Sequence, residues 1–341
     1  MKVNRDIRIQ KYASANILGN TQNLLAILEK IQNRYKIEDI HDLRVASRRI
    51  RTALSIFAPF FPKSKIQGWG STIRSITSDF GKTRDLDVQI EFLENQLNAI
   101  SDRKVRAGIN RLQLRLIQNR KKRDRKVKKH TTSLLKSKDL NSLLNTMQRI
   151  SQTPGEENYP VELYQLAFHT IYNALDQFLY YEVFIQHPEN IHELHLMRIA
   201  AKKVRYTLEV FLPLYQGKMD AFLDIMKNIQ QKLGAIHDCD VWITFIPEFM
   251  EAEKQRTLKY YGRSSAFHRF IPGLEFIKKD RQQERDRIYT EFMNEWQKWR
   301  SAETWLRMRE LILQASVSVM DNTPINTDGS RGNEKNANIS G

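Results

Sequence analysis

The chain has 341 residues, 41% of them hydrophobic, and its 55 Lys and Arg outnumber its 39 Asp and Glu to give a net charge of +16. A single cysteine, Cys239, excludes an internal disulfide framework and a CxxC metal site. No apolar run approaches the ~18 residues expected of a membrane-spanning helix, and residues 1–8 lack the apolar core of a signal peptide. We therefore expect a soluble cytoplasmic protein with one large core or two modest ones, whose surface favours polyanions: nucleic acid, anionic membrane or polyphosphate.

Helical periodicity runs through nearly the whole chain, and Gly and Pro are scarce, at 13 and 9 residues. The first helical segments are predicted at residues 8–33, 40–58, 66–81, 85–99, 103–130 and 138–150. Residues 151–160 have the Pro, Gly and polar content of a linker. The second series is predicted at residues 161–186, 190–212, 218–235, 238–256, 267–299 and 302–320. Residues 321–341 have few large apolar side chains and are predicted to be disordered.

One sequence pattern occurs twice. Residues 41–51 read HDLRVASRRIR, and residues 195–205 read HLMRIAAKKVR. Each copy has a histidine, then cations three, seven, eight and ten residues later. A second pattern, FGKTRDLDV at residues 80–88, matches LGAIHDCDV at residues 233–241 at nearly the same offset. Two elements repeated in the same order predict tandem homologous halves, at about residues 5–150 and 161–320.

Helical geometry places four residues of each copy, those at positions 0, 3, 7 and 10, on one face. We call these two rows the cationic ladders: His41, Arg44, Arg48 and Arg51, and His195, Arg198, Lys202 and Arg205. Each ladder is roughly 15 Å long, and Arg49 and Lys203 lie beside it. Aligned like charges repel by about 0.2–0.5 kcal/mol per pair, so the arrangement indicates acidic neighbours or an anionic ligand. A solvated basic face would explain one such helix, but its recurrence in both halves favours ligand binding. Arginine suits phosphate because its planar fork can engage two oxygens.

Two Asp-x-Asp pairs follow the glycines of the second pattern. Asp85 and Asp87 follow Gly81, and Asp238 and Asp240 follow Gly234. Such carboxylates can hold Mg²⁺, but we favour structural roles. In these, each glycine ends a helix and the aspartates either cap the next one or orient nearby arginines.

His237-Asp238 is similar to the His-Asp pair of metal-dependent phosphohydrolases, yet its counterpart in the first half begins with Arg84, which cannot ligate a metal. The sequence contains no Gly-rich phosphate loop, serine nucleophile elbow or zinc-ligand spacing. We therefore predict no catalytic residue, no metal and no cofactor. A single metal centre in the second half remains the alternative.

Residues 103–129 are the densest basic stretch, with only one acid, Asp124. Within it, Arg111 and Arg115 lie four apart on an amphipathic helix. Such a run is usually a solvated face, but here it is placed to extend an anion site or to attract nucleic acid nonspecifically. No helix-turn-helix, zinc finger or RNA-stacking motif indicates sequence recognition.

Both repeated patterns resemble the CHAD family, the conserved-histidine α-helical domain, over about residues 5–315. The resemblance implies an all-α fold of two four-helix bundles, related by a pseudo-two-fold around a basic groove or pore. It further implies binding of inorganic polyphosphate and, in some members, association with polyphosphate granules. Some members carry a fused triphosphatase domain of the CYTH type, for which this chain leaves no room. We therefore expect one CHAD domain at residues 1–320 that binds polyphosphate without turnover.

The residues expected to bind polyphosphate come from the two patterns and from the basic stretch. They are His41, Arg44, Arg48, Arg49, Arg51, Arg74, Arg111, Arg115, His195, Arg198, Lys202, Lys203, Arg205 and Lys227. Arg74 and Lys227 match the basic position before the family's glycine. The expected location is the cytoplasm and its polyphosphate granules, with only weak, nonspecific binding of nucleic acid and no membrane partner. Two alternatives stay open: a nonspecific nucleic-acid-binding protein, and a metal-dependent phosphohydrolase that uses the His237-Asp238 region.

Overall fold

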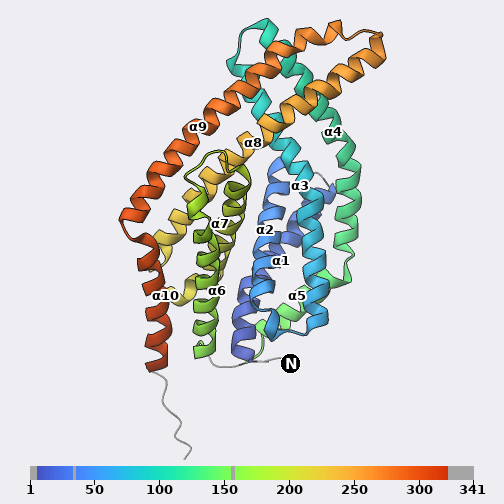
Figure 1. The fold of residues 1–341 in the computed structure, drawn as a ribbon. Helices are drawn as coiled ribbons and strands as arrows, with labels where there is room; N and C mark the ends of the chain where they lie inside the picture. Colours follow the sequence, from blue (N-terminus) through green and yellow to red (C-terminus); the bar gives the residue numbers. More distant parts are fainter. Residues whose placement is uncertain (1–5, 34–35, 155–157, 322–341) are drawn as a thin grey trace, which may run out of the picture.

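The computed structural model describes residues 6–33, 36–154 and 158–321 (Figure 1). These residues form ten α-helices and four short 3-10 helices, with no strand among them, which confirms the predicted all-α fold. The helices are α1 (Ile7–Asn33), α2 (Ile37–Ile56), α3 (Lys63–Ala99), α4 (Arg103–Leu135), α5 (Lys138–Ser151), α6 (Val161–Leu179), α7 (Ile191–Phe211), α8 (Asp220–Tyr261), α9 (Ile271–Ser301) and α10 (Thr304–Asp321). In the part of the chain that the structure describes, no helix combines the length and apolar character that crossing a bilayer requires.

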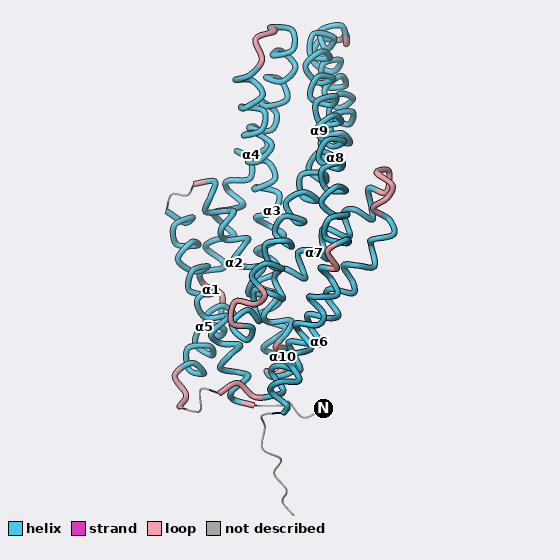
Figure 2. Tube along the Cα trace, turned by 90° about the vertical axis from the view of Figure 1, so that its left-hand side faces the viewer, coloured by secondary structure: helices cyan, strands magenta, loops and turns pink. Residues whose placement is uncertain are grey.

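The neighbours of each helix follow the same order in the two halves of the chain. In the first half α2 packs against α1 and α3, α4 against α3, and α5 against α1. In the second half α7 packs against α6 and α8, α9 against α8, and α10 against α6. The halves meet where α2 lies beside α7 and where α4 crosses α9, and the long helices extend together beyond the rest of the molecule (Figures 1 and 2).

A large hydrophobic core runs through both halves without a break. At its centre the rings of Phe57 and Phe211, which occupy matching positions of the two copies, meet edge to face with 6.1 Å between centroids. Tyr12 stacks on Phe211, and its hydroxyl donates a hydrogen bond of 2.7 Å to the carbonyl of Val210. A smaller second core joins the extended ends of α3, α4, α8 and α9. The halves are therefore held together by continuous packing.

Two glycines allow α4 and α9 to cross with their backbones in contact. A β-carbon on Gly108 would lie 2.2 Å from the carbonyl oxygen of Phe270, and one on Gly273 would lie 2.1 Å from that of Val105. Each glycine thus faces the carbonyl three residues before the other. Any larger residue at either position would push the two helices apart.

The predicted helix boundaries at Gly81 and Gly234 are wrong, because both glycines lie inside long continuous helices, α3 and α8. An interior glycine costs only about 1 kcal/mol relative to alanine. Here Phe80 and Leu233, buried beside the glycines, anchor these helices to the large core. Asp85, Asp87, Asp238 and Asp240 consequently sit within helices and cap none.

Other boundaries shifted by smaller amounts. Helix α6 ends at Leu179 and is followed by a 3-10 turn, Tyr180–Phe184, within the segment expected to be helical to residue 186. Of the linker expected at residues 151–160, Ser151 still belongs to α5, the rest falls between α5 and α6, and residues 155–157 lie outside the described part. Of the tail expected to be disordered, Asp321 ends α10 and residues 322–341 lie outside the described part.

Candidate functional site

The two cationic ladders lie side by side where α2 packs against α7. The charges of Arg44 and Arg198 interact across this contact. The charge of Arg48 lowers the pKa values of both Arg198 and Lys202. Two rows that are more than 150 residues apart in the chain thus form one cluster of cations.

The central cations of this cluster have no salt-bridge partner. Within the described residues, no carboxylate forms an ion pair with Arg44, Arg48, Arg198 or Lys202. Asp85 and Asp238 lie farther away and contribute only to the local electrostatic field. Arg44 donates a hydrogen bond of 3.0 Å to the carbonyl of Thr77. The buried Nε of Arg198 has no hydrogen-bond partner. This nitrogen faces the surface of α8 at Gly234.

Burial, together with neighbouring positive charges, lowers the pKa values of Arg44, Arg198 and Lys202. Burial is the main cause for Lys202, and with the charges of Arg198, Arg48 and Arg44 it lowers the pKa of Lys202 to about 7. Burial likewise lowers the pKa of Arg44 and Arg198, which stay charged. An anion bound here would raise the pKa values of Lys202, Arg44 and Arg198 again, because it would supply the missing negative charge.

The ladder arginines lie against the glycines of the second pattern. A β-carbon on Gly81 would lie 2.6 Å from Nη1 of Arg44, so the guanidinium would have to shift. A β-carbon on Gly234 would lie 3.7 Å from Nε of Arg198, an ordinary van der Waals distance. Each arginine therefore lies across the surface of the neighbouring helix, α3 or α8, at its glycine, and the close approach gives Gly81 a role that a helix end does not explain.

The two ladder histidines have different partners. Nδ1 of His195 lies 3.1 Å from Nδ1 of His237, so at least one of these nitrogens carries no proton. Burial, with the charge of Arg198 next, lowers the pKa of His237 to about 4, and burial also lowers that of His195. In the first half, Arg84 takes the place of His237; burial and then the charge of Arg84 lower the pKa of His41. The sequence did not identify Arg84 and His237 as part of the site, although both lie in the second repeated pattern.

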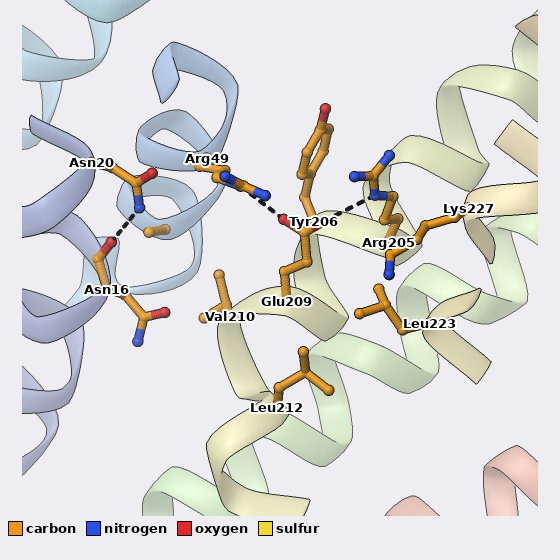
Figure 3. Close-up of a pocket in the computed structure, with 11 residues that line it drawn as sticks. Asn16, Asn20, Arg49, Arg205, Tyr206, Glu209, Val210, Leu212, Leu223 and Lys227 are labelled. Atoms are coloured by element: carbon orange, nitrogen blue, oxygen red, sulfur yellow. Dashed lines mark hydrogen bonds and ion pairs between the residues drawn. The ribbon is translucent and has the colours of Figure 1, made fainter. Parts of the chain in front are cut away.

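The outer cations of the predicted set are mostly paired. Arg49 and Arg205 both bind Glu209, and Lys227 binds Asp224. Lys203 donates a hydrogen bond of 2.8 Å to Gln177 on α6. Arg51 and Arg74 lie near each other and make no ion pair within the described residues. Arg49, Arg205 and Lys227 line a pocket of about 380 Å³ at the end of the ladders (Figure 3).

Arg111 and Arg115 belong to a different cluster, beside the second core. Both bind Glu253 of α8, whose side chain is fully buried, and Arg256 binds the same carboxylate. Burial alone would raise the pKa of Glu253, but the hydrogen bonds from Arg115, Arg256 and Arg111 lower it overall. The structure therefore does not bring these two arginines to the ladders. No pattern in the sequence singles out Glu253.

One aspartate of each pair binds an arginine, as one of the two structural alternatives proposed. Asp87 binds Arg120 on α4, and Asp240 binds Arg285 on α9. Arg285 also donates a hydrogen bond of 2.6 Å to the carbonyl of Pro188. Among residues 6–33, 36–154 and 158–321, no three His, Cys, Asp or Glu side chains lie close enough to hold a metal ion together.

The model of the CHAD domain matches residues 18–247. Among curated proteins, no sequence matches significantly. The CHAD domain from the plant Ricinus communis has a similar fold, with a TM-score of 0.54 and 19% identity over 81% of this chain and 86% of that one. PptA from Streptomyces chartreusis is similar with a TM-score of 0.55 and 13% identity over 84% of this chain and 99% of that one. At such identities the structures show a shared fold alone, but the family model covers most of the chain, and we conclude that the chain belongs to the CHAD domain family.

Proposed function

We propose that this protein binds inorganic polyphosphate without turnover, in a basic groove along α2 and α7. The observation that carries the proposal is the central cluster of Arg44, Arg48, Arg198 and Lys202. These half-buried cations repel one another and lack ion-pair partners in the described structure. An anionic ligand relieves that repulsion through charge-assisted hydrogen bonds.

The arrangement suits a linear polyanion with evenly spaced charges. Two ladders of roughly 15 Å face the same groove, so successive phosphate groups meet cations at every helical turn. Arginine forks and histidine donors bind phosphate oxygens without reading a sequence. We propose that the two halves arose by duplication and are related by a pseudo-two-fold axis. This symmetry would place equivalent ladders on opposite sides of a bound polyphosphate chain. The contact between Phe57 and Phe211 and the reciprocal crossing of Gly108 and Gly273 support this symmetry.

Two features favour binding over hydrolysis. Asp240, which follows the His237-Asp238 pair of the phosphohydrolase alternative, is buried and bound to Arg285. His237 is turned to His195. The expected location follows from the ligand, in the cytoplasm at polyphosphate granules.

Calorimetric titration with polyphosphate of defined length, at about 0.05 and 0.15 M salt, tests this function. We expect saturable binding that weakens with salt, because each contact releases a counterion. The double variant Arg44→Gln/Arg198→Gln should bind about 100-fold more weakly, since each lost charge-assisted contact contributes about 1.5 kcal/mol. The control, Lys121→Gln/Lys128→Gln, removes the same charge from the exposed face of α4 and should bind as the wild type does. Absence of saturable binding at both salt concentrations contradicts the proposal.

Nonspecific nucleic-acid binding is the second candidate, because one face of α4 is strongly basic. The exposed side chains on this face form no ion pair within the described residues: Lys121, Lys122, Arg125, Lys126, Lys128 and Lys129. Competition with duplex DNA of equal charge at about 0.15 M salt separates the candidates. If DNA displaces polyphosphate equally well, or if the α4 control loses polyphosphate binding, the surface of α4 is the binding site and the groove is not.

A further inference from the structure

One carboxylate sits between the two halves at the end of the ladders. Glu209 of α7 accepts a hydrogen bond of 2.9 Å from Nε of Arg49 on α2, and another of 2.9 Å from Nε of Arg205 on α7 (Figure 3). Its side chain is only 15% exposed. A carboxylate held by two guanidinium groups from two helices has the geometry with which arginines also bind a phosphate group.

This carboxylate borders the pocket described above. The pocket lies between α1, α2, α7 and α8, and its polar lining includes Asn16, Asn20 and Lys227 in addition to the two arginines. Its volume of about 380 Å³ leaves room for further anionic groups beside Glu209. Arg205 is the last residue of the second ladder, so the pocket continues the row of central cations.

The first half has no counterpart of this acid. In the alignment of the two copies, Ser55 occupies the position of Glu209, and Arg51 occupies that of Arg205. Arg51 is exposed, and its charged neighbours are the cations Arg48 and Arg74. Arg205, by contrast, is paired with the acid Glu209. The same ladder position is thus open in one half and occupied by an internal acid in the other.

We propose that the pocket at the end of the ladders is a phosphate subsite, and that Glu209 occupies its two arginines as an internal anion until the ligand displaces it. The inference rests on the proposed function. It adds a specificity-determining residue: a phosphate chain long enough to reach beyond the central cations must exchange its own oxygens for the carboxylate of Glu209. Short oligophosphates fill the central ladders without displacing it.

Two reciprocal variants test this subsite by calorimetry with polyphosphate at several salt concentrations. Glu209→Gln keeps the size of the side chain and frees Arg49 and Arg205, so binding should be about tenfold tighter, because the ligand no longer has to displace a carboxylate. The slope of log affinity against log salt should change little, because the phosphate chain contacts both arginines in the wild type as well. Ser55→Glu places an acid four residues after Arg51 and should weaken binding by about threefold to tenfold.

The matched control is Asp176→Asn. It breaks the ion pair of Asp176 with Arg309, between α6 and α10, and raises the net charge by the same amount as Glu209→Gln. Its binding and salt slope should equal those of the wild type, and circular dichroism checks that each variant is folded.

The outcomes separate the two claims. If the wild type binds but Glu209→Gln does not change the affinity, or changes it no more than the control, the subsite is wrong and the proposed function stands. If neither protein binds, both claims fail. If only Glu209→Gln binds, Glu209 blocks the arginines and no ligand displaces it, so both claims fail for the wild type.

Discussion

Two clusters of arginines in this molecule illustrate opposite solutions to the burial of positive charge. At the extended end, Arg111 and Arg115 surround Glu253, whose buried carboxylate accepts hydrogen bonds from both. At the centre, Arg44 and Arg198 face further cations and have no acid in contact within the described structure. Both clusters lie on amphipathic helices and look alike as runs of basic residues. The presence of a buried acid separates a structural cluster from one that is open to a ligand.

The difference follows from desolvation. A buried charge is tolerated when its partner is also buried and hydrogen-bonded, and removal of that partner leaves an uncompensated charge. The Glu253 cluster therefore stabilises the fold, whereas the central cluster destabilises it until an anion arrives. The following predictions test this contrast, from the largest expected effect to the smallest.

Removal of the buried acid should have the largest effect. Glu253→Ala leaves Arg111 and Arg115 without their partner and should lower the free energy of unfolding by about 3–5 kcal/mol. Urea denaturation followed by circular dichroism measures this change. The folded fraction should still bind polyphosphate with unchanged affinity. A stability loss below about 1 kcal/mol would remove the contrast between the two clusters.

Removal of a central cation should have the opposite effect and stabilise the fold. Lys202→Met replaces a desolvated amine with an apolar chain of similar length and should raise the free energy of unfolding by about 1 kcal/mol. The same variant should bind polyphosphate about tenfold more weakly, because it loses one charged contact. Parallel denaturation and calorimetry give both values, and a variant that is destabilised would show that Lys202 has a structural role.

The pH dependence of binding should reflect the same lysine. In the free protein the pKa of Lys202 is about 7, below its ordinary value of 10.5, and a bound polyanion raises it. Binding therefore takes up a proton above pH 7, and affinity should fall about fivefold between pH 7 and 8. In the absence of ligand the sign is opposite: the unfolded chain holds more protons from about pH 7 to 10.5, so stability rises with pH across that window.

Calorimetry in buffers of different ionisation enthalpy measures the proton uptake directly. Lys202→Arg keeps the charge and should remove most of this dependence, because arginine stays protonated. An unchanged pH profile in that variant would assign the effect to another group.

The exposed face of α4 should give the smallest effect. Lys121→Gln/Lys128→Gln removes two solvated charges that have no partner in the described structure, and the free energy of unfolding should change by less than about 0.5 kcal/mol. Thermal denaturation checks this value. A larger loss would indicate that α4 depends on these lysines for packing.

The sequence predicted the helices and the ladders well, because both depend on local spacing. Residues at intervals of three, four and seven fall on one helical face whatever the tertiary context. The sequence does not predict that Arg44 lies beside Arg198, and the family resemblance implies only a shared basic groove or pore. Local spacing does not state which faces of two distant helices meet.

The misplaced features depend on long-range partners. Gly81 suggested a helix end, since nothing nearby in the sequence reveals that the guanidinium of Arg44 needs the space. Arg111 looked available because its partner, Glu253, is 142 residues away. The link between His195 and His237 likewise depends on how α7 packs against α8. Whether a charged side chain is free to bind a ligand thus depends on its partners in the folded structure, which composition does not reveal.

The crossing of Gly108 and Gly273 couples the evolution of the two halves. Because each glycine rests against the backbone of the other half, a side chain gained in one copy would displace a helix of the other. No change elsewhere within one half can compensate for that displacement. The two copies of the second pattern differ at Arg84 and His237, whereas the two crossing glycines must be retained together. A mutation screen should therefore find both glycines intolerant to replacement, singly and in combination.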